Sequence, residues 1–204
     1  MSHQPRVTKW TIALLAVALS VGLVPSVQAQ QPEPDAAMKA MMAAWTAYAT
    51  PGEAHKRLAK RVGAWSVKVK FWMAPGTEPQ LSDGTSEITA IMGGRYLVEK
   101  FRSQLLEGPF EGMSISGYDN IKKKYVSVWV DSMSTGILAN EGSTDPGGKS
   151  MTFWGQTPDP VAGKYKKTRA VETTIDEKSF RFQSYDIGPD GKEFLAMEMV
   201  YART

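Results

Sequence analysis

Strict alternation of apolar and polar residues begins at Gly63 and predicts a β-strand over Gly63–Phe71. Trp65, Val67 and Val69 share one face of this strand, and serine and lysine residues occupy the other. From here, turn residues recur roughly every 8 to 12 positions, a spacing typical of an all-β sandwich or barrel. The pattern therefore predicts a sheet protein whose first strand carries Trp65.

Further strands follow, separated by turn signals such as Asp145-Pro146-Gly147-Gly148 and Asp190-Gly191. No helical pattern lies between them, which disfavours a parallel α/β sheet, since such a sheet needs crossover helices. Closure of sequential hairpins removes exposed strand edges, so we predict one closed antiparallel meander β-barrel of about ten strands, an all-β fold. The strands expected after the first are 82–91, 95–104, 110–118, 124–131, 136–141, 150–156, 164–175, 179–187 and 193–203.

An amphipathic helix is predicted ahead of the barrel. Asp35 is a suitable cap for a helix that runs to about Tyr48, in which methionines and Trp45 recur at the spacing of one helical face. We interpret it as a surface helix docked on the domain or as a partly mobile arm. The alternative is a Met-rich lid near the mouth of the barrel, because methionine adapts to irregular apolar surfaces.

A second, shorter helix is predicted directly before the first strand. Thr50 as cap, Pro51 at the first helical position and Glu53 three residues after the cap form a capping box. This helix ends at Gly63 and delivers the chain into the Trp65 strand.

Residues 1–29 have the three-part pattern of a secretory signal peptide. Arg6 and Lys9 form a basic start, an uncharged run of 15 residues follows, and small residues precede a cut after Ala29. That run is shorter than the ~20 residues needed to span a bilayer. We therefore expect cleavage, export to the periplasm or the extracellular space, and no stable membrane span afterwards.

Cleavage leaves 175 of the 204 residues, a length that suits one domain with a sizeable core. We divide it into a spacer with the amphipathic helix at 30–49 and the barrel domain with its leading short helix at 50–204. Loss of two basic residues with the signal peptide leaves 22 basic and 21 acidic residues. Such a balance does not favour binding to nucleic acid. The chain has no cysteine, which excludes disulfides, thiol chemistry and sulfur-ligated zinc.

Gly63-Ala64-Trp65 and Tyr201-Ala202-Arg203 stand at opposite ends of the predicted barrel sequence. In this pair the chain resembles the calycin group, the lipocalins and fatty-acid-binding proteins, whose barrels stack a first-strand tryptophan beneath a basic residue of the last strand. The resemblance implies that Arg203 lies over Trp65 in a cation–π contact and closes one end of the barrel.

From about residue 55 to 204 the chain is also similar to a bacterial family of unknown function, DUF1579. This family has no established activity, so the resemblance supports the fold and leaves the function open. The similarity is carried by Gly63-Ala64-Trp65, Met92-Gly93-Gly94-Arg95, Gly117-Tyr118-Asp119, Trp129-Val130-Asp131-Ser132-Met133-Ser134-Thr135, Gly188-Pro189-Asp190-Gly191 and Tyr201-Ala202-Arg203.

The predicted strand 124–131 has two unlike faces. Valines form one face, while Tyr125, Ser127, Trp129 and Asp131 form the other, which continues to Met133. Apolar walls with a few placed polar groups are typical of a small-molecule cavity, so this mixed face is a candidate lining. Alternatively, the valines face a packed interior and the mixed face meets water.

Trp154 and Glu198 are further candidates for the interior. An inward-facing Asp131 would need a partner for its buried charge, and four arginines on other strands are candidates. Asp131 and Glu198 together would suit acid/base chemistry if they met with different pKa values. Structural ion pairs are the commoner role for such carboxylates. The four candidate arginines are Arg95, Arg102, Arg169 and Arg181.

His55 is the only histidine outside the signal peptide, so any Ser-His-Asp triad or histidine-ligated metal would have to use it. We interpret it as a solvated or capping-turn residue. The alternative is a single axial haem ligand, as in the haem-binding members of related ten-stranded barrels. Those proteins place the histidine on the barrel wall, where this sequence has none, so no cofactor and no metal site are predicted.

These observations favour an exported β-barrel that binds a small hydrophobic or amphipathic molecule without transforming it. Trp129, Asp131, Met133 and Trp154 would line the cavity, with Glu198 as a further candidate. One alternative is an enzyme on the same scaffold that uses Asp131 or Glu198 as acid or base. Another is a structural or interaction protein without a ligand cavity. The sequence does not indicate the oligomeric state.

Overall fold

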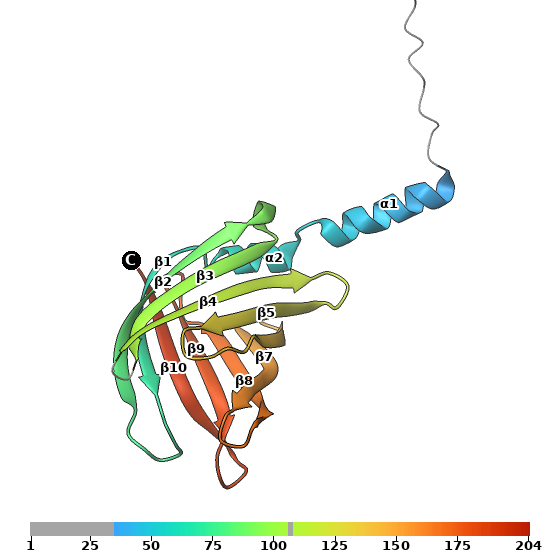
Figure 1. The fold of residues 1–204 in the computed structure, drawn as a ribbon. Coiled ribbons are helices and arrows are strands. Elements are labelled where there is room, and N and C mark those ends of the chain that lie inside the picture. The colour runs from blue at the N-terminus through green and yellow to red at the C-terminus, as the bar shows by residue number, and fades with distance from the viewer. Residues whose placement is uncertain (1–34, 106–107) are drawn as a thin grey trace, which may run out of the picture.

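The computed structural model describes residues 35–105 and 108–204, except for the side chain of Leu105. The predicted signal peptide and the first residues of the predicted spacer lie outside the described residues. Two α-helices precede an uninterrupted series of strands (Figure 1). In chain order the elements are α1 (Ala36–Ala49), α2 (Glu53–Ala59), β1 (Gly63–Phe71), β2 (Gln80–Ile91), the 3-10 turn η1 (Met92–Gly94), β3 (Tyr96–Leu105), β4 (Gly108–Asp119), β5 (Lys124–Asp131), β6 (Leu138–Thr144), β7 (Ser150–Asp159), β8 (Lys164–Thr174), β9 (Ser179–Ile187) and β10 (Glu193–Arg203).

The strands form a closed antiparallel barrel, which confirms the predicted fold class. Each strand pairs with its neighbours in sequence, and β1 also pairs with β10, from Trp65 opposite Arg203 to Phe71 opposite Met197. All pairings between sequential strands are local hairpins. The pairing of β1 with β10 joins the two ends of the sheet and closes the barrel. Among the strands that the structure describes, the closed order therefore leaves no edge unpaired.

Strand positions agree closely with the alternation in the sequence. β1, β5, β9 and β10 match the predicted segments residue for residue. The largest shifts occur at hairpin ends: β7 continues past the predicted end at Gln156, because Thr157, Pro158 and Asp159 still pair with β8. Hairpin pairing extends these strands further than the local pattern of side chains indicates.

α1 is an exposed arm that extends away from the barrel (Figure 1). Asp35 caps it as predicted, because its Oδ1 accepts a hydrogen bond from the backbone N–H of Met38 at 2.7 Å. The helix buries none of its residues, and Trp45 is 63% exposed. Its C-terminal end is held by Asn120, whose side-chain amide donates to the carbonyls of Tyr48 and Thr50 at 2.8 and 2.9 Å.

This arm therefore corrects the prediction of a lid near the mouth lined by Trp129. Asn120 lies in the β4–β5 turn, at the α2 end of the barrel, whereas Trp129 lies toward the opposite end of β5. Neither helix in the described part of the chain is long and apolar enough to cross a membrane.

α2 begins later than the predicted capping box. Gly52 is its N-cap, and the side chain that accepts the capping hydrogen bond is His55, whose Nδ1 receives the N–H of Gly52 at 3.0 Å. Thr50 instead belongs to the end of α1, where its hydroxyl donates to the carbonyl of Thr46. The intervening Pro51 favours an extended residue before it, so the second helix starts only after Gly52.

The contact between Arg203 and Trp65 that the resemblance implied is present at the end of the barrel beside α2. The Arg203 guanidinium lies 4.3 Å from the centroid of the Trp65 ring and donates to the carbonyls of Val62 and Lys60 at 2.9 and 3.0 Å. The Trp65 indole N–H donates to the carbonyl of Arg61 at 2.9 Å. The first strand, the last strand and the residues after α2 are thus joined in one contact.

Candidate functional site in the barrel lumen

The mixed face of β5 points into the barrel. In the antiparallel register Ser127 lies opposite Ser116 and Trp129 opposite Ser114, and Ser114 in turn lies opposite Glu99 of β3. Residues directly opposite each other share a face of the sheet, so these side chains share the face of the buried Phe101. The valines of β5 occupy the outer wall. Of the two readings of this strand, the structure shows the one in which the mixed face is internal.

The lumen has two unlike walls. On β1 and β10 the inward-facing side chains are apolar and tightly packed, with Val67 only 1% exposed. β2 and β3 add Ile88 and Phe101 to this core and also carry the inward-facing polar residues Ser86 and Glu99.

On β4–β9 many inward-facing positions are small or hydroxylated, and several of these are partly accessible, although Tyr125, Met151 and Phe180 are buried. Because the partly accessible side chains point inward, their accessible surface faces the lumen. The partly accessible inward-facing polar residues include Ser114, Ser116, Ser127, Asn140, Thr168 and Ser184.

Aromatic rings line the lumen on the far side from α2. The rings of Phe110 and Trp129 are nearly parallel at 6.5 Å between centroids, and Phe101 meets Phe110 edge-on at 6.0 Å. The Trp129 ring lies directly over Gly112, where an added Cβ would come within 2.2 Å of the indole. A glycine is therefore required at position 112 for the ring to lie flat against the wall.

Asp131 holds the Trp129 indole in place. One carboxylate oxygen accepts the indole N–H at 2.8 Å, and the other accepts the backbone N–H of Met133 at 2.9 Å. The predicted arginine partner is replaced by these two neutral donors: within the described ranges, no arginine or lysine forms an ion pair with Asp131. Asp131 is the last residue of β5, so the backbone N–H of Met133 in the following loop can donate one of the two hydrogen bonds.

A second carboxylate, Glu99, lies deeper in the lumen. Its Oε1 accepts hydrogen bonds from the Ser86 hydroxyl at 2.7 Å and the Tyr201 hydroxyl at 3.1 Å. Its Oε2 accepts a single long bond of 3.4 Å from Ser114. Burial raises the pKa of Glu99, the negative charge of Glu172 raises it further, and the hydroxyl donors partly oppose these effects.

We expect this carboxyl to make the stability of the protein depend on pH. The pKa of Glu99 is raised in the folded state from 4.5, so its contribution is fully present below about pH 4.5 and is lost as the pH rises through the folded pKa. Each unit by which the pKa is raised on folding corresponds to about 1.4 kcal/mol of folding free energy. Urea unfolding over this pH range should show a decline in the free energy of unfolding that Glu99→Gln reduces. An equal decline in both proteins would assign it to another group.

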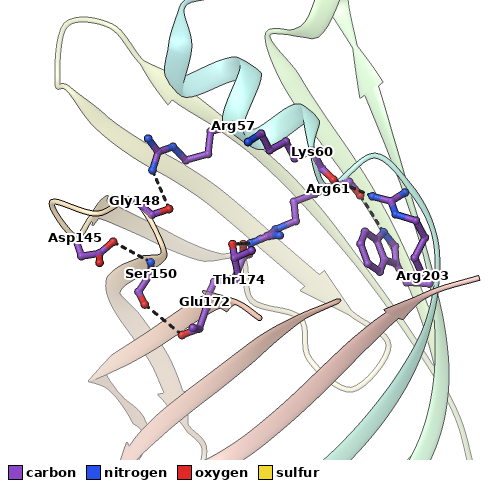
Figure 2. A network of polar contacts seen from close by, with 11 residues as sticks. Arg57, Lys60, Arg61, Asp145, Gly148, Ser150, Glu172, Thr174 and Arg203 are labelled. Carbon is purple, nitrogen blue, oxygen red and sulfur yellow. Dashed lines mark hydrogen bonds and ion pairs between the residues drawn. The ribbon is translucent and has the colours of Figure 1, made fainter. Parts of the chain in front are cut away.

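An ion pair separates this lumen from α2. Arg61, which follows α2, donates from Nε to Glu172 at 2.7 Å and from a terminal nitrogen to the Thr174 hydroxyl at 3.0 Å (Figure 2). Its guanidinium also lies 4.2 Å from the ring centroid of Phe180, which stacks on Tyr201 at 4.1 Å. Glu172 thereby has a counter-charge at the end of the lumen beside α2.

Trp154 and Glu198 do not lie in the lumen, so the expectation that they point inward is wrong. Trp154 is 56% exposed on the outer wall, since the inward positions of β7 are those of Met151 and Phe153. Glu198 alternates with the inward-facing Met197 and Met199 and accepts a hydrogen bond from Gln183 on the outer wall. Asp131 and Glu198 therefore stand on opposite faces of the sheet and form no catalytic pair.

Met133, the remaining predicted lining residue, lies in the β5–β6 loop with 60% of its surface exposed. Of the five predicted ligand-binding residues, the structure places Trp129 and Asp131 on the inner wall of the barrel. Glu99 was missed, although a signal for it is present: Glu99 stands between Leu97 and Phe101 at the two-residue spacing of an inward face.

His55 has a structural position beneath α2. It is buried, its Nδ1 is occupied by the capping hydrogen bond, and its ring meets Tyr118 edge-on at 5.9 Å. Burial lowers its pKa, so the neutral ring is favoured. Among residues 35–105 and 108–204, no three His, Cys, Asp or Glu side chains are grouped to hold a metal ion. The absence of a cofactor stays a prediction.

A cleft of about 790 Å³ lies outside the barrel, between α2 and the β6–β7 and β8–β9 turns. Five basic side chains line it, but three of them are engaged with the protein. Lys56 pairs with Glu53, Arg57 donates to the carbonyl of Gly148 at 3.0 Å (Figure 2), and Arg61 binds Glu172. This cleft mainly accommodates the contacts that attach α2 to the barrel. Its basic side chains are Lys56, Arg57, Lys60, Arg61 and Lys149.

A family model described as a protein of unknown function, DUF1579, matches residues 50–203. The chain belongs to the DUF1579 family. The match covers the barrel and α2 of this DUF1579 protein and leaves out α1. A search of curated proteins finds no match to the chain.

The fold of this DUF1579 protein is similar to that of Rv2717c from M. tuberculosis, known from a crystal structure. The two chains are 12% identical, the TM-score is 0.53, and the match covers 76% of this chain and 99% of the other. A redesigned β-barrel also matches, with 14% identity, a TM-score of 0.38 and coverage of 76% and 99%. At such identity the first similarity shows the shared fold alone.

Proposed function

We propose that this protein binds a small hydrophobic or amphipathic molecule in the lumen of its barrel and does not transform it. The observation that carries the proposal is the set of partly accessible hydroxyl-bearing residues on the inner wall of β4–β9, together with the apolar inner wall of β1 and β10. A packed barrel of this size would fill its interior with large side chains, whereas here serine, threonine and glycine occupy many inward positions.

The chemistry of the lining supports a ligand of mixed character. Small-molecule sites are mostly apolar and aromatic, with a few polar groups that fix orientation. The aromatic rings of Phe110 and Trp129 supply the first kind of surface. Glu99 and the hydroxyls of β4 and β5 supply the second. A purely apolar ligand would leave these hydroxyls without partners.

Native mass spectrometry of the protein purified from cell extracts would identify a bound molecule, and N-phenyl-1-naphthylamine provides a fluorescent probe. We expect Ser127→Phe, which fills the lumen, to weaken probe binding at least about tenfold, equivalent to ~1.4 kcal/mol. Ser143→Phe places the same ring on the exposed outer wall of β6 and should leave binding unchanged. Equal binding by the wild type and the Ser127 variant would count against the lumenal site.

We also propose the calycin-type relationship and the export of the chain. The Arg203–Trp65 stacking supports the first, and the pattern of residues 1–29 supports the second. The working protein would be periplasmic or extracellular. Protein recovered from the cell envelope should begin at Gln30, and an N-terminus at residue 1 would contradict cleavage.

The exposed arm α1 favours a second candidate function, in which the barrel also serves as a scaffold for protein interaction. Met41 and Trp45 lie on this helix with at least half of their surface exposed. Light scattering would test this reading, since Trp45→Lys should dissociate any assembly that uses the arm. A monomeric wild-type protein would leave ligand binding as the sole proposal.

A further inference from the structure

The charges inside the lumen do not balance. Among the described inward-facing residues, Glu172 pairs with Arg61 and Asp186 with Lys166 at 2.7 Å. Glu99 and Asp131 have no cationic partner there. Glu99 and Asp131 are therefore the inward-facing carboxyl groups of the described residues that have no protein cation beside them, and a bound cation would favour the ionised form of Glu99 against the effect of burial on its pKa.

Glu99 has capacity for another hydrogen-bond donor. An ionised carboxylate accepts at about four sites, and Glu99 receives three hydrogen bonds. Two of these converge on Oε1, while Oε2 has only the 3.4 Å contact from Ser114. Ser114 and Glu99 are both partly accessible although they face inward. Oε2 is thus the oxygen with capacity for a further hydrogen-bond donor.

The aromatic cluster lies on the same inner face of the sheet as Glu99, toward the far end of the barrel. Glu99, Ser114 and Trp129 are successive members of one row across β3, β4 and β5. Strands lie ~4.8 Å apart, so the backbones of Glu99 and Trp129 are separated by about 10 Å. Phe101 and Phe110 extend the aromatic surface from this row toward the far end of the barrel. A carboxylate beside aromatic faces is the arrangement that recognises ammonium groups.

We propose that the ligand is a cationic amphiphile whose ammonium group binds Oε2 of Glu99, with its apolar part along the partly accessible rings of Phe110 and Trp129. The ammonium would donate to the under-used carboxylate oxygen and lie against the Trp129 ring. Asp131 acts behind the ring as a positioning residue, because its hydrogen bond to the indole N–H fixes the ring orientation. This inference rests on the proposed lumenal binding and specifies its ligand class.

The test uses three dansyl-labelled alkyl probes of one chain length that end in an ammonium, a hydroxyl or a carboxylate group. We expect the ammonium probe to bind at least about tenfold more tightly than the carboxylate probe, as a charge-assisted contact allows. Glu99→Gln should remove this preference and keep binding of the hydroxyl probe. Glu198→Gln, on the outer wall, is the matched control and should keep the preference.

A second variant tests the aromatic contact independently. Trp129→Leu keeps an apolar side chain over Gly112 and should weaken the ammonium probe several-fold more than the hydroxyl probe. Equal affinity for the three probes, or a preference for the carboxylate, would overturn the ligand class while binding of the hydroxyl probe upheld the lumenal site. An ammonium preference that survived Glu99→Gln would overturn the role of Glu99. Failure of all three probes and of N-phenyl-1-naphthylamine would overturn both proposals.

Discussion

Replacing Trp65 with alanine is expected to lower the free energy of unfolding by about 3–5 kcal/mol, the usual cost of removing a large aromatic side chain from a core. Trp65 is 2% exposed and meets Phe180 edge-on at 4.9 Å between centroids. Its loss also removes the ring under Arg203 and the indole hydrogen bond to Arg61. Chemical denaturation with urea would measure the change.

Trp154→Ala provides a matched control, because both tryptophans lie on barrel strands and differ in the face they occupy. Trp154 points outward, and surface substitutions usually alter stability by less than about 0.5 kcal/mol. Ligand binding should persist in both variants under conditions where each is folded. Wild-type-like unfolding of the Trp65 variant would contradict the role assigned to the Trp65–Arg203 contact in closing the barrel.

The second large effect is expected for Arg61→Ala, which should lower the free energy of unfolding by about 3–5 kcal/mol. The Arg61 and Glu172 side chains are only 13% and 18% exposed, so removal of the arginine leaves a largely buried carboxylate without a counter-charge. The negative charge of Glu172 raises the pKa of Glu99. Removal of Arg61 would therefore also change the electrostatic environment of Glu99 in the lumen.

Two comparisons isolate this effect. Lys68→Ala breaks the ion pair with Asp83, in which both side chains are 75% exposed, and should cost less than about 1 kcal/mol. Adding Glu172→Gln to the Arg61 variant should restore part of the lost stability, because the unpaired charge is then removed. If Arg61→Ala cost no more than Lys68→Ala, the ion pair would not support the end of the barrel.

The positions of the strands were predictable because each depends on neighbours in the chain. Period-two alternation determines which residues share a face, and turn residues such as Asp190-Gly191 determine where a hairpin reverses. The closing contact between Trp65 and Arg203 was also predictable, because a resemblance linked the two ends of the barrel. The start of α2 was not, since Gly52 and His55 provide a cap that competes with Thr50.

The site was only partly predictable for a related reason. Alternation separates the two faces of β5 but does not say which one is internal, and both readings of Trp129 and Asp131 remained open. The register with β4 decides this, because Ser114 and Gly112 place the mixed face beside Glu99 and Phe101. The registers of β7 with β6 and of β10 with β9 likewise place Trp154 and Glu198 on the outer face.

The sequence by itself determined the all-β class, the order and approximate limits of the strands, and the residues that share each face, because these follow from local periodicity and turn chemistry. The tertiary structure alone decided which face lines the lumen, that Glu99 rather than Glu198 is the inward carboxylate, and that α1 extends from the end opposite Trp129. These features depend on pairings between strands and on burial, which bring together residues such as Glu99 and Tyr201 that are far apart in the chain.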